Sequence, residues 1–256
     1  MIVFPNAKIN IGLNVVQKRE DDFHNIESVF YPVFDVFDVL EILESETLIF
    51  TSSGIDIPGN EESNLCFKAY QLLKQDYDIP FVKIHLHKVI PIGAGLGGGS
   101  ADAAFTLKAL NSLFNLDLSI EQLINYSRKL GSDCAFFIEN KPVYAFNKGD
   151  EFEVISLDLS LYNIKIEYPN IHIGTGLAYR GISPKLSLHN LKDLIQGSIF
   201  NWKETINNDF ENSVFPKYPE IKDAKQKMYD EGAVYAAMTG SGSAIFGVFK
   251  KNKKKL

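Results

Sequence analysis

The sequence predicts a soluble fold that mixes β-strands with α-helices. Residues 7–15 alternate between apolar and polar side chains, which is typical of a half-buried strand. Residues 100–114 place apolar side chains along one stripe, which is typical of an amphipathic helix. The chain has 256 residues, enough for one large domain or two modest ones.

More strands are expected in the first half, where apolar, β-branched and aromatic residues cluster. After a turn at residues 58–60, Ser63 or Asn64 can cap a helix that buries Ala69 and Leu73. The strands predicted in this half cover residues 28–33, 36–43, 47–51 and 82–87.

The second half also mixes helices and strands. Ser119 and Gln122 have the spacing of a capping box and open one helix. Pro219 and Gly232 are typical of the start and the end of another. Strands are expected at residues 164–168, 234–238 and 244–249, the last two joined by a loop at 239–243.

The charge distribution argues against nucleic acid as a partner. Lys and Arg number 26 and Asp and Glu number 32, which gives a net charge of −6. Five lysines stand at positions 250–255, and without them 21 basic residues face 32 acidic ones, a net charge of −11. Attraction to a phosphate backbone needs a basic face, so a phosphorylated ligand must be held by a local device.

The cysteines and the chain start indicate a cytoplasmic protein. Cys66 and Cys134 lie far apart in sequence, which is neither a disulfide framework nor a metal cluster. The first residues carry no basic lead-in, and no apolar stretch approaches the roughly 18 residues of a membrane span. We therefore expect a cytoplasmic protein with no membrane partner.

A glycine-rich segment lies between a predicted strand and a predicted helix. Five glycines fall within seven positions, and glycine lets a ligand approach main-chain N–H groups closely. The helix start adds unpaired N–H donors and a positive dipole end, so the segment suits phosphate. The alternative is a flexible surface loop. The segment consists of Pro91, Ile92, Gly93, Ala94, Gly95, Leu96, Gly97, Gly98, Gly99, Ser100 and Ala101.

Three common phosphate-binding loops do not match this segment. A Walker loop needs Lys and Ser or Thr after its last glycine, whereas Gly99 leads to Ser100-Ala101-Asp102. A dinucleotide loop needs an acidic residue at a strand end about 20 positions on; Asp117 and Glu121 lie at that distance, but around a predicted helix cap. The lysine and aspartate patterns of protein kinases are also missing.

Residues 91–104 instead resemble the ATP loop of the GHMP small-molecule kinases. Residues 5–10 and 239–244 resemble the first and third motifs of that superfamily, in the same order. Four further segments resemble the branch that phosphorylates a cytidine-diphosphate-linked methylerythritol. These segments are residues 7–13, 22–24, 130–133 and 208–211.

The resemblance implies an α+β fold in two lobes. Residues 1–150 would bind ATP and carry the catalytic base, and residues 151–256 would form a smaller α+β domain that closes over the substrate. The implied activity transfers the ATP γ-phosphate to an alcohol hydroxyl, with Mg²⁺ carried mainly by ATP and not by a protein metal site. The implied partners are small molecules, and the implied assembly is a monomer or a weak homodimer.

The resemblance also implies catalytic roles. Asp133 would be the general base, although Ser132-Asp133 before an apolar run is also a common helix start. Lys8 would keep that carboxylate ionised and stabilise phosphoryl charge; on its pattern alone it is a solvated lysine. Asn10, on the same strand side, would contact substrate or phosphate. Ser100 would touch phosphate or Mg²⁺, with helix capping as the alternative.

A second group of residues would bind the cytidine end of the substrate. Phe23 and Tyr179 would stack on the base, and His24 would face its hydrogen-bonding edge. Phe23 stands where the family usually has tyrosine, so stacking is retained without the phenol hydroxyl. Gly240 and Gly242 would shape a turn near the substrate. Ordinary loop packing and a plain hairpin are the alternatives.

Other functions remain open on the sequence. A different GHMP kinase would share the ATP loop but take another alcohol, and residues 22–24 argue for cytidine. An inactive nucleotide-binding module is disfavoured because Lys8 and Asp133 are both present. A nicotinamide oxidoreductase is disfavoured because the acidic strand-end residue is missing.

Overall fold

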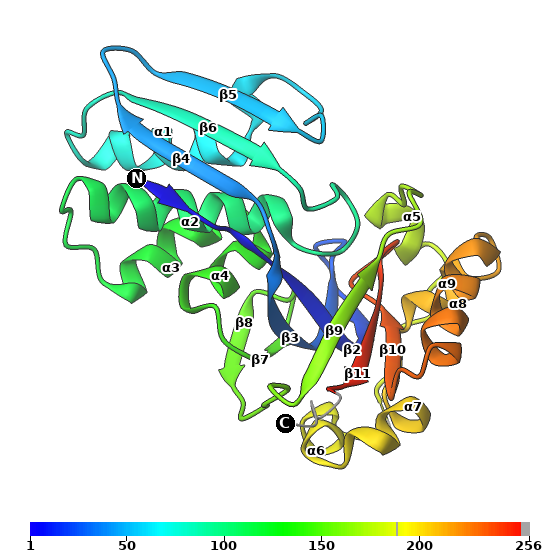
Figure 1. Cartoon of the computed structure of the whole chain (residues 1–256). Coiled ribbons are helices and arrows are strands. Elements are labelled where there is room, and N and C mark those ends of the chain that lie inside the picture. Colours follow the sequence, from blue (N-terminus) through cyan, green and yellow to red (C-terminus); the bar gives the residue numbers. More distant parts are fainter. Residues whose placement is uncertain (188, 252–256) are drawn as a thin grey trace. The chain divides into compact units, whose positions relative to one another are not determined.

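The computed structural model describes residues 1–187 and 189–251. It combines three β-sheets with α-helices, as the α+β prediction requires (Figure 1). The chain divides into two compact units that are discontinuous in sequence. Unit 1 contains residues 1–8, 32–92 and 97–141, and unit 2 contains residues 9–31, 93–96 and 142–256.

Unit 1 is built on a four-stranded sheet with the order β1-β4-β6-β5. All neighbours are antiparallel except β5 and β6, which are parallel. Ile42 pairs with Ile84, and Ile84 pairs with Phe50, so one face of the sheet carries a buried apolar row. The strands are β1 (Ile2–Val3), β4 (Val39–Glu44), β5 (Ile49–Gly54) and β6 (Val82–Lys88).

Two helices of unit 1 begin at caps that the sequence predicts. The Asn64 side chain accepts a hydrogen bond from the Cys66 N–H at 2.8 Å and caps α1. Ser119 and Gln122 form both bonds of a capping box at α3. The helices are η1 (Glu61–Ser63), α1 (Leu65–Asp76), α2 (Gly98–Leu113), α3 (Ile120–Arg128), η2 (Ser132–Ala135) and α4 (Phe136–Glu139).

Two long strands run from one unit into the other. They are β2 (Asn6–Lys18) and β3 (His24–Phe37). The alternation in β2 predicts one solvent-exposed face, but Lys8 and Asn10 on that face are only 3% and 2% exposed. The strand is therefore buried on both sides, because its polar side chains find polar partners inside the protein.

Unit 2 holds the remaining sheets, ordered β2-β3-β7-β8 and β10-β11-β9. Helix α9 packs on β10 and β11 and starts with Pro219 at its first turn, as predicted. The strands are β7 (Val143–Phe146), β8 (Glu151–Val154), β9 (Tyr162–Glu167), β10 (Tyr235–Met238) and β11 (Ile245–Lys250). The helices are α5 (Thr175–Tyr179), α6 (Leu191–Gln196), η3 (Ile199–Asn201), α7 (Trp202–Thr205), α8 (Phe210–Val214) and α9 (Pro219–Asp230).

The compact units do not follow the predicted division at residue 150. Unit 2 recruits residues 9–31 because β3 pairs with β7 and because Leu13 lies beside Asn208. Such long-range pairing leaves no trace in local hydrophobic patterns. The contiguous domains 1–150 and 151–256 therefore stay a prediction from the resemblance.

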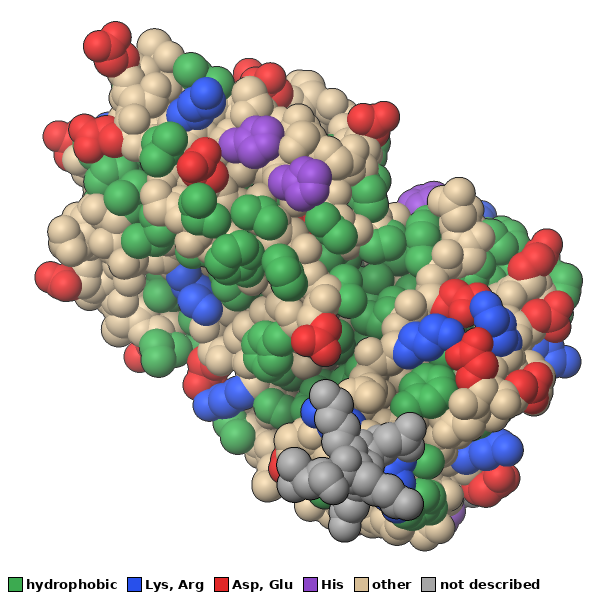
Figure 2. Space-filling view, in the orientation of Figure 1, with side chains coloured by type: hydrophobic (Ala, Val, Ile, Leu, Met, Phe, Trp, Pro, Cys, Tyr) green, Lys and Arg blue, Asp and Glu red, His purple; other side chains and the backbone are tan. Residues whose placement is uncertain are grey.

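The surface carries both signs of charge. On the face drawn in Figure 2, acidic and basic side chains are interspersed. In the described part of the chain, no helix has the length and apolar character needed to cross a membrane. The lysine tail is described only as far as residue 251, so Lys253, Lys254 and Lys255 lie outside the described residues.

Candidate functional site

The glycine-rich segment is shared between the units. Residues 91–92 and 97–101 belong to unit 1, and residues 93–96 belong to unit 2. In unit 1, Gly97 is the N-cap of α2 with a left-handed φ of 73° and supplies no side-chain cap. The first N–H groups of an α-helix lack partners within the helix, so those of Gly98, Gly99 and Ser100 can face an anion. Ser100 lies in the first turn and is not the cap.

A buried ion cluster supports the start of α2. Lys88 is ion-paired with Asp38 and, at 2.9 Å between Nζ and Oδ2, with Asp102 of the first turns of α2. A Cβ added at Gly98 would lie 2.8 Å from Lys88 Nζ, so the helix start rests directly on this lysine. Burial opposes the charge of Lys88, but the two carboxylates outweigh burial and raise its pKa.

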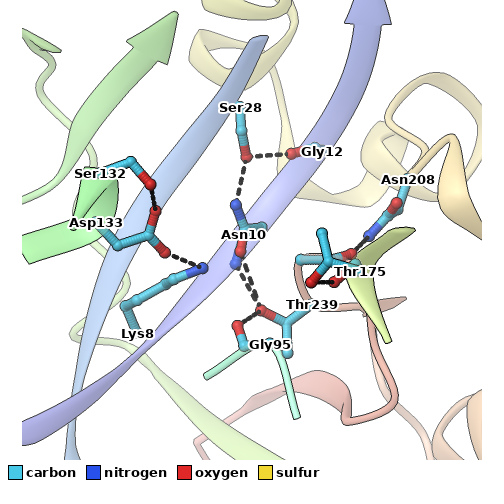
Figure 3. Close-up of polar contacts among 12 residues, drawn as sticks. Lys8, Asn10, Gly12, Ser28, Gly95, Ser132, Asp133, Thr175, Asn208 and Thr239 are labelled. Carbon is cyan, nitrogen blue, oxygen red and sulfur yellow. Dashed lines mark hydrogen bonds and ion pairs between the residues drawn. The ribbon is translucent and has the colours of Figure 1, made fainter. Parts of the chain in front are cut away.

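Lys8 and Asp133 meet in unit 1 although 125 positions separate them. Lys8 Nζ lies 3.4 Å from Asp133 Oδ2 (Figure 3). The Lys8 side chain also passes Gly97, since a Cβ added there would lie 3.0 Å from Lys8 Cγ. A buried cation, a carboxylate and the start of α2 are thus neighbours within one unit.

The electrostatics of this pair suit proton transfer. The Lys8 side chain is 4% exposed and that of Asp133 is 29% exposed, so the carboxylate can be reached from solvent. Burial lowers the pKa of Lys8, and Asp133 partly restores it. Asp133 lies within the first turn of η2, whose N-cap is Gly131, so it does not hold the predicted capping position. Neither the solvated-lysine alternative nor the capping alternative describes this geometry.

In unit 2, the turn at residues 93–96 is in backbone contact with the loop at residues 239–243. The Thr239 hydroxyl donates to Gly95 O at 3.0 Å, and Ala244 N donates to Ala94 O at 3.1 Å. Gly95 has a φ of 81°, and a Cβ there would lie only 2.0 Å from Thr239 O. The approach of the two backbones therefore requires glycine at position 95.

The predicted glycines Gly240 and Gly242 both lie in this loop. They have φ values of 55° and 94°, in the left-handed region that favours glycine. A Cβ at Gly240 would lie 3.2 Å from Gly95 Cα. The loop is thus more than the plain hairpin connection given as the alternative, because it packs on the turn at residues 93–96.

Asn10 is tied into the same network. Its backbone N–H donates to Thr239 Oγ1 at 3.0 Å, and its side-chain amide donates to Ser28 Oγ at 2.9 Å (Figure 3). Ser28 in turn donates to Gly12 O at 2.6 Å. The Asn10 side chain is therefore engaged inside the protein. Thr239 was not predicted as a site residue, although its place at the head of the third motif was a usable signal.

The predicted aromatic residues are arranged differently from the expected pair. The rings of His24 and Tyr179 stack, with centroids 4.5 Å apart and planes inclined by 23°. Phe23 is 61% exposed, and Lys148 Nζ lies 5.4 Å from the centre of its ring. Burial, with a smaller contribution from Lys18, lowers the pKa of His24, which favours its neutral form. A neutral imidazole offers one donor and one acceptor.

His172 is a neighbour of the glycine-rich turn that the sequence did not suggest. A Cβ added at Gly93 would lie 2.6 Å from His172 Cε1, and the imidazole is exposed. Ser243 at the end of the 239–243 loop donates a hydrogen bond to Ile171 O. No motif or periodicity marks residues 171–172, so only the three-dimensional structure identifies them.

Comparisons with known proteins agree with this architecture. The profile of the GHMP kinases N terminal domain matches residues 64–141, and that of the GHMP kinases C terminal domain matches residues 188–255. A crystal structure of 4-(cytidine 5'-diphospho)-2C-methyl-D-erythritol kinase superposes with a TM-score of 0.81 at 29% sequence identity. The superposition covers 97% of this chain and 90% of that one.

Two curated relatives are similar over almost their whole length. Both are named 4-diphosphocytidyl-2-C-methyl-D-erythritol kinase. The protein from Cytophaga hutchinsonii is 52% identical, over 97% of this chain and 92% of the relative. The protein from Bacteroides fragilis is 48% identical, over 99% of this chain and 94% of the relative. The chain therefore belongs to the GHMP kinase family.

Proposed function

We propose that this kinase transfers the γ-phosphate of ATP to a hydroxyl of 4-diphosphocytidyl-2-C-methyl-D-erythritol, a step in isoprenoid precursor synthesis. The relatives at about half identity carry this name. The observation that carries the chemistry is the pairing of Lys8 with Asp133 beside the start of α2. A GHMP kinase with another alcohol acceptor is the competing function.

Asp133 is the proposed general base. Its carboxylate takes the proton of the acceptor hydroxyl as that oxygen attacks the γ-phosphorus. The new oxygen–phosphorus bond forms while the bond to the bridging oxygen of ATP breaks, and ADP leaves. Lys8, with its ammonium 3.4 Å from the carboxylate, keeps Asp133 ionised before the transfer and stabilises negative charge as it develops.

The start of α2 is proposed to hold phosphate oxygens. The N–H groups of Gly98, Gly99 and Ser100 provide donors, and the helix dipole favours negative charge there. Among residues 1–187 and 189–251, no group of three His, Cys, Asp or Glu side chains could cage a metal ion. Mg²⁺ would be carried mainly by the phosphate oxygens of ATP.

His24 and Tyr179 are proposed to recognise cytosine. Their stacked rings provide a flat aromatic surface, and a neutral imidazole can pair with the hydrogen-bonding edge of a base. The exposed ring of Phe23 is available as a further stacking surface. Asn10, Gly240 and Gly242 are assigned to shaping the surroundings of the phosphates and the acceptor.

A coupled ADP-release assay tests this function. We expect turnover with the cytidine-linked substrate and much weaker turnover with its uridine-linked analogue. Asp133→Asn should keep ATP binding but lower kcat by about 10²- to 10⁴-fold, the usual contribution of a general base. The matched control is Asp193→Asn, which changes an exposed carboxylate in α6 and should leave kcat unaltered.

Each arm of this assay can contradict part of the proposal. Near-normal turnover of Asp133→Asn would remove Asp133 as the base. Equal activity with the uridine analogue would exclude cytosine recognition. ADP release that requires a different alcohol would favour the competing GHMP kinase, and ATP binding without transfer to any acceptor would indicate an inactive module.

A further inference from the structure

Residues 207–211 of unit 2 form a segment to which the proposed mechanism gives no role. The segment follows α7, runs into the first turn of α8 and contains Asn208, Asp209 and Glu211, which the sequence marks only by their resemblance to a family motif. Asn208 is 1% exposed and Glu211 is 8% exposed. Buried polar side chains are costly unless their hydrogen bonds are made, so the partners of this segment indicate its purpose.

Asn208 binds the backbone on both sides of Thr239. Its amide Nδ2 donates to Met238 O at 2.7 Å and to Gly240 O at 2.9 Å. Its Oδ1 accepts from Phe210 N at 2.9 Å. Both donors and the acceptor of one short side chain are thereby used, and they fix the course of the chain through Thr239.

The same segment is fastened to the strand that carries Asn10. Leu13 N donates to Asn207 O at 2.9 Å, and Asp209 N donates to Leu13 O at 2.8 Å. The Asp209 carboxylate accepts from Val15 N at 2.8 Å. Residues 207–209 thus form a parallel β-bridge beside β2, and their position relative to Asn10 is set by main-chain hydrogen bonds.

Glu211 fastens the segment to the strand before the loop. Its Oε1 accepts from Met238 N at 2.9 Å, and its Oε2 pairs with Lys225 Nζ at 2.6 Å. Met238 is therefore held at its N–H by Glu211 and at its carbonyl by Asn208. Both N–H donors of Asn208 are used, so Asn208 could donate to a ligand only by breaking one of these bonds.

Thr239 connects the 239–243 loop to the turn at residues 93–96. It is fully buried, and its hydroxyl donates to Gly95 O and accepts from Asn10 N. A buried hydroxyl cannot exchange its partners for water without a penalty, so a shift of Thr239 leaves Gly95 O and Asn10 N unsatisfied. The shape of the turn at residues 93–96 therefore depends on where Thr239 stands.

We propose that Asn208 is a positioning residue for the turn at residues 93–96 of the glycine-rich segment. It touches no substrate; it fixes Met238 and Gly240 so that the Thr239 hydroxyl holds Gly95, and Glu211 assists by holding Met238. The inference deepens the proposed kinase function and rests on it for its kinetic consequences. Its structural part, the order of residues 93–96 and 239–244, does not depend on which alcohol is phosphorylated.

Asn208→Asp is the decisive variant. It keeps the size of the side chain and the acceptor for Phe210 N, but it loses both N–H donors and sets a carboxylate beside two carbonyls. We expect kcat/KM for ATP to fall by about 10- to 100-fold, as for other small misplacements of a binding loop. Amide hydrogen exchange at residues 93–96 and 239–244 should become faster in the same variant.

Tyr229→Phe is the matched control. The Tyr229 hydroxyl donates to Ala236 O at 3.1 Å and accepts from Ala236 N at 3.2 Å, on the strand β10 that leads into the loop. Its removal costs two hydrogen bonds in the same unit without touching the loop. We expect a lower Tm with kcat/KM for ATP and loop exchange unchanged. If Asn208→Asp merely repeats this pattern, Asn208 is only structural and the proposal is overturned.

Thr239 provides a second pair of variants in case Asn208→Asp does not fold. Thr239→Val removes the hydroxyl at constant shape and should accelerate exchange at residues 93–96, whereas Thr239→Ser keeps the hydroxyl and should restore protection. The double variant Asn208→Asp/Thr239→Val should have a kcat/KM for ATP no lower than that of the poorer single variant. Both substitutions act through one route of contacts, from Asn208 through Thr239 to Gly95. Additive losses, or unchanged exchange in Thr239→Val, would refute the route.

If the wild type phosphorylates no cytidine-linked substrate, the proposed function fails, but the hydrogen-exchange results still decide this inference.

Discussion

At the scale of the residue, Lys8 shows how a buried environment changes an ordinary side chain. Its position on an alternating strand is that of a solvated lysine, yet it is 3% exposed and paired with Asp133. Burial disfavours the ammonium form, and a single half-exposed carboxylate restores it only in part, so the pKa of Lys8 is lowered. Lys8 therefore loses its charge at a lower pH than an ordinary lysine does.

The pH profile of kcat should report this lysine. Because the pKa of Lys8 is lowered, the ammonium loses its proton below pH 10.5, and kcat should fall on the alkaline side from that point. Lys8→Arg should move the alkaline limb to higher pH even if kcat is smaller overall, since arginine stays protonated. Lys83→Arg, at an exposed position of β6, is the control and should leave the profile unchanged. An alkaline limb that stays in place in Lys8→Arg would dissociate Lys8 from the transfer.

The same shift has a defined sign for stability. The unfolded chain keeps the proton of Lys8 up to about pH 10.5, whereas the folded protein releases it earlier. In the window between the two pKa values the unfolded state binds more protons, so the free energy of unfolding contributed by this group rises with pH. Activity and stability therefore respond to Lys8 in opposite directions.

At the scale of the element, two glycine-containing loops pack together through their backbones. Gly95 adopts a left-handed conformation directly against Thr239 O. Gly99 lies in the first turn of α2, where an added Cβ would be 3.8 Å from Leu65 Cδ1, an ordinary contact distance. The two glycines look equivalent in the sequence, but only Gly95 lacks room for a Cβ. The number of glycines predicted a phosphate loop, and the contacts say which of them the fold requires.

Substitution by alanine separates these two positions. Gly95→Ala forces the 93–96 turn and the 239–243 loop apart, because a Cβ there would lie 2.0 Å from a carbonyl oxygen. A strained backbone costs about 1–3 kcal/mol of unfolding free energy, so Tm should fall markedly. Gly99→Ala, in a helix with open space, should keep or slightly raise Tm. Calorimetry of both variants checks this, and equal Tm values would contradict the close contact.

The local signals for elements were reliable where a physical device stands behind them. Asn64 caps α1, the Ser119–Gln122 pair forms its capping box, and Pro219 opens α9. Each of these depends only on neighbours within four residues, so a sequence can encode it directly. The burial of the polar face of β2 could not be predicted, because its partners, such as Asp133 and Thr239, lie more than 120 positions away.

At the scale of the whole molecule, each unit is assembled from segments that are separate in the sequence. Residues 9–31 and 93–96 belong to unit 2 although unit 1 sequence surrounds them. Strands β2 and β3 continue from one unit into the other, so neither unit can lose its strands while the other keeps them intact. This organisation favours cooperative unfolding over the independent melting of two contiguous domains.

Equilibrium unfolding tests this cooperativity. The protein has a single tryptophan, Trp202, which is 2% exposed and reports on unit 2 alone. Far-UV circular dichroism reports on the helices of both units. We expect the two signals to change at the same urea concentration. Separate midpoints would mean that the units unfold independently, and a stable fragment 1–150 would then support contiguous domains.

The sequence by itself determined the helices and strands that rest on local caps and periodicity, the glycine-rich segment before a helix and the order of the three motifs. Those features depend on neighbours in the chain, which the sequence displays. Only the tertiary structure decided that Lys8 is buried against Asp133, that His24 stacks on Tyr179, and that Asn208 braces Thr239. These contacts join residues far apart in sequence, and their energies depend on burial and distance, which only the folded chain defines.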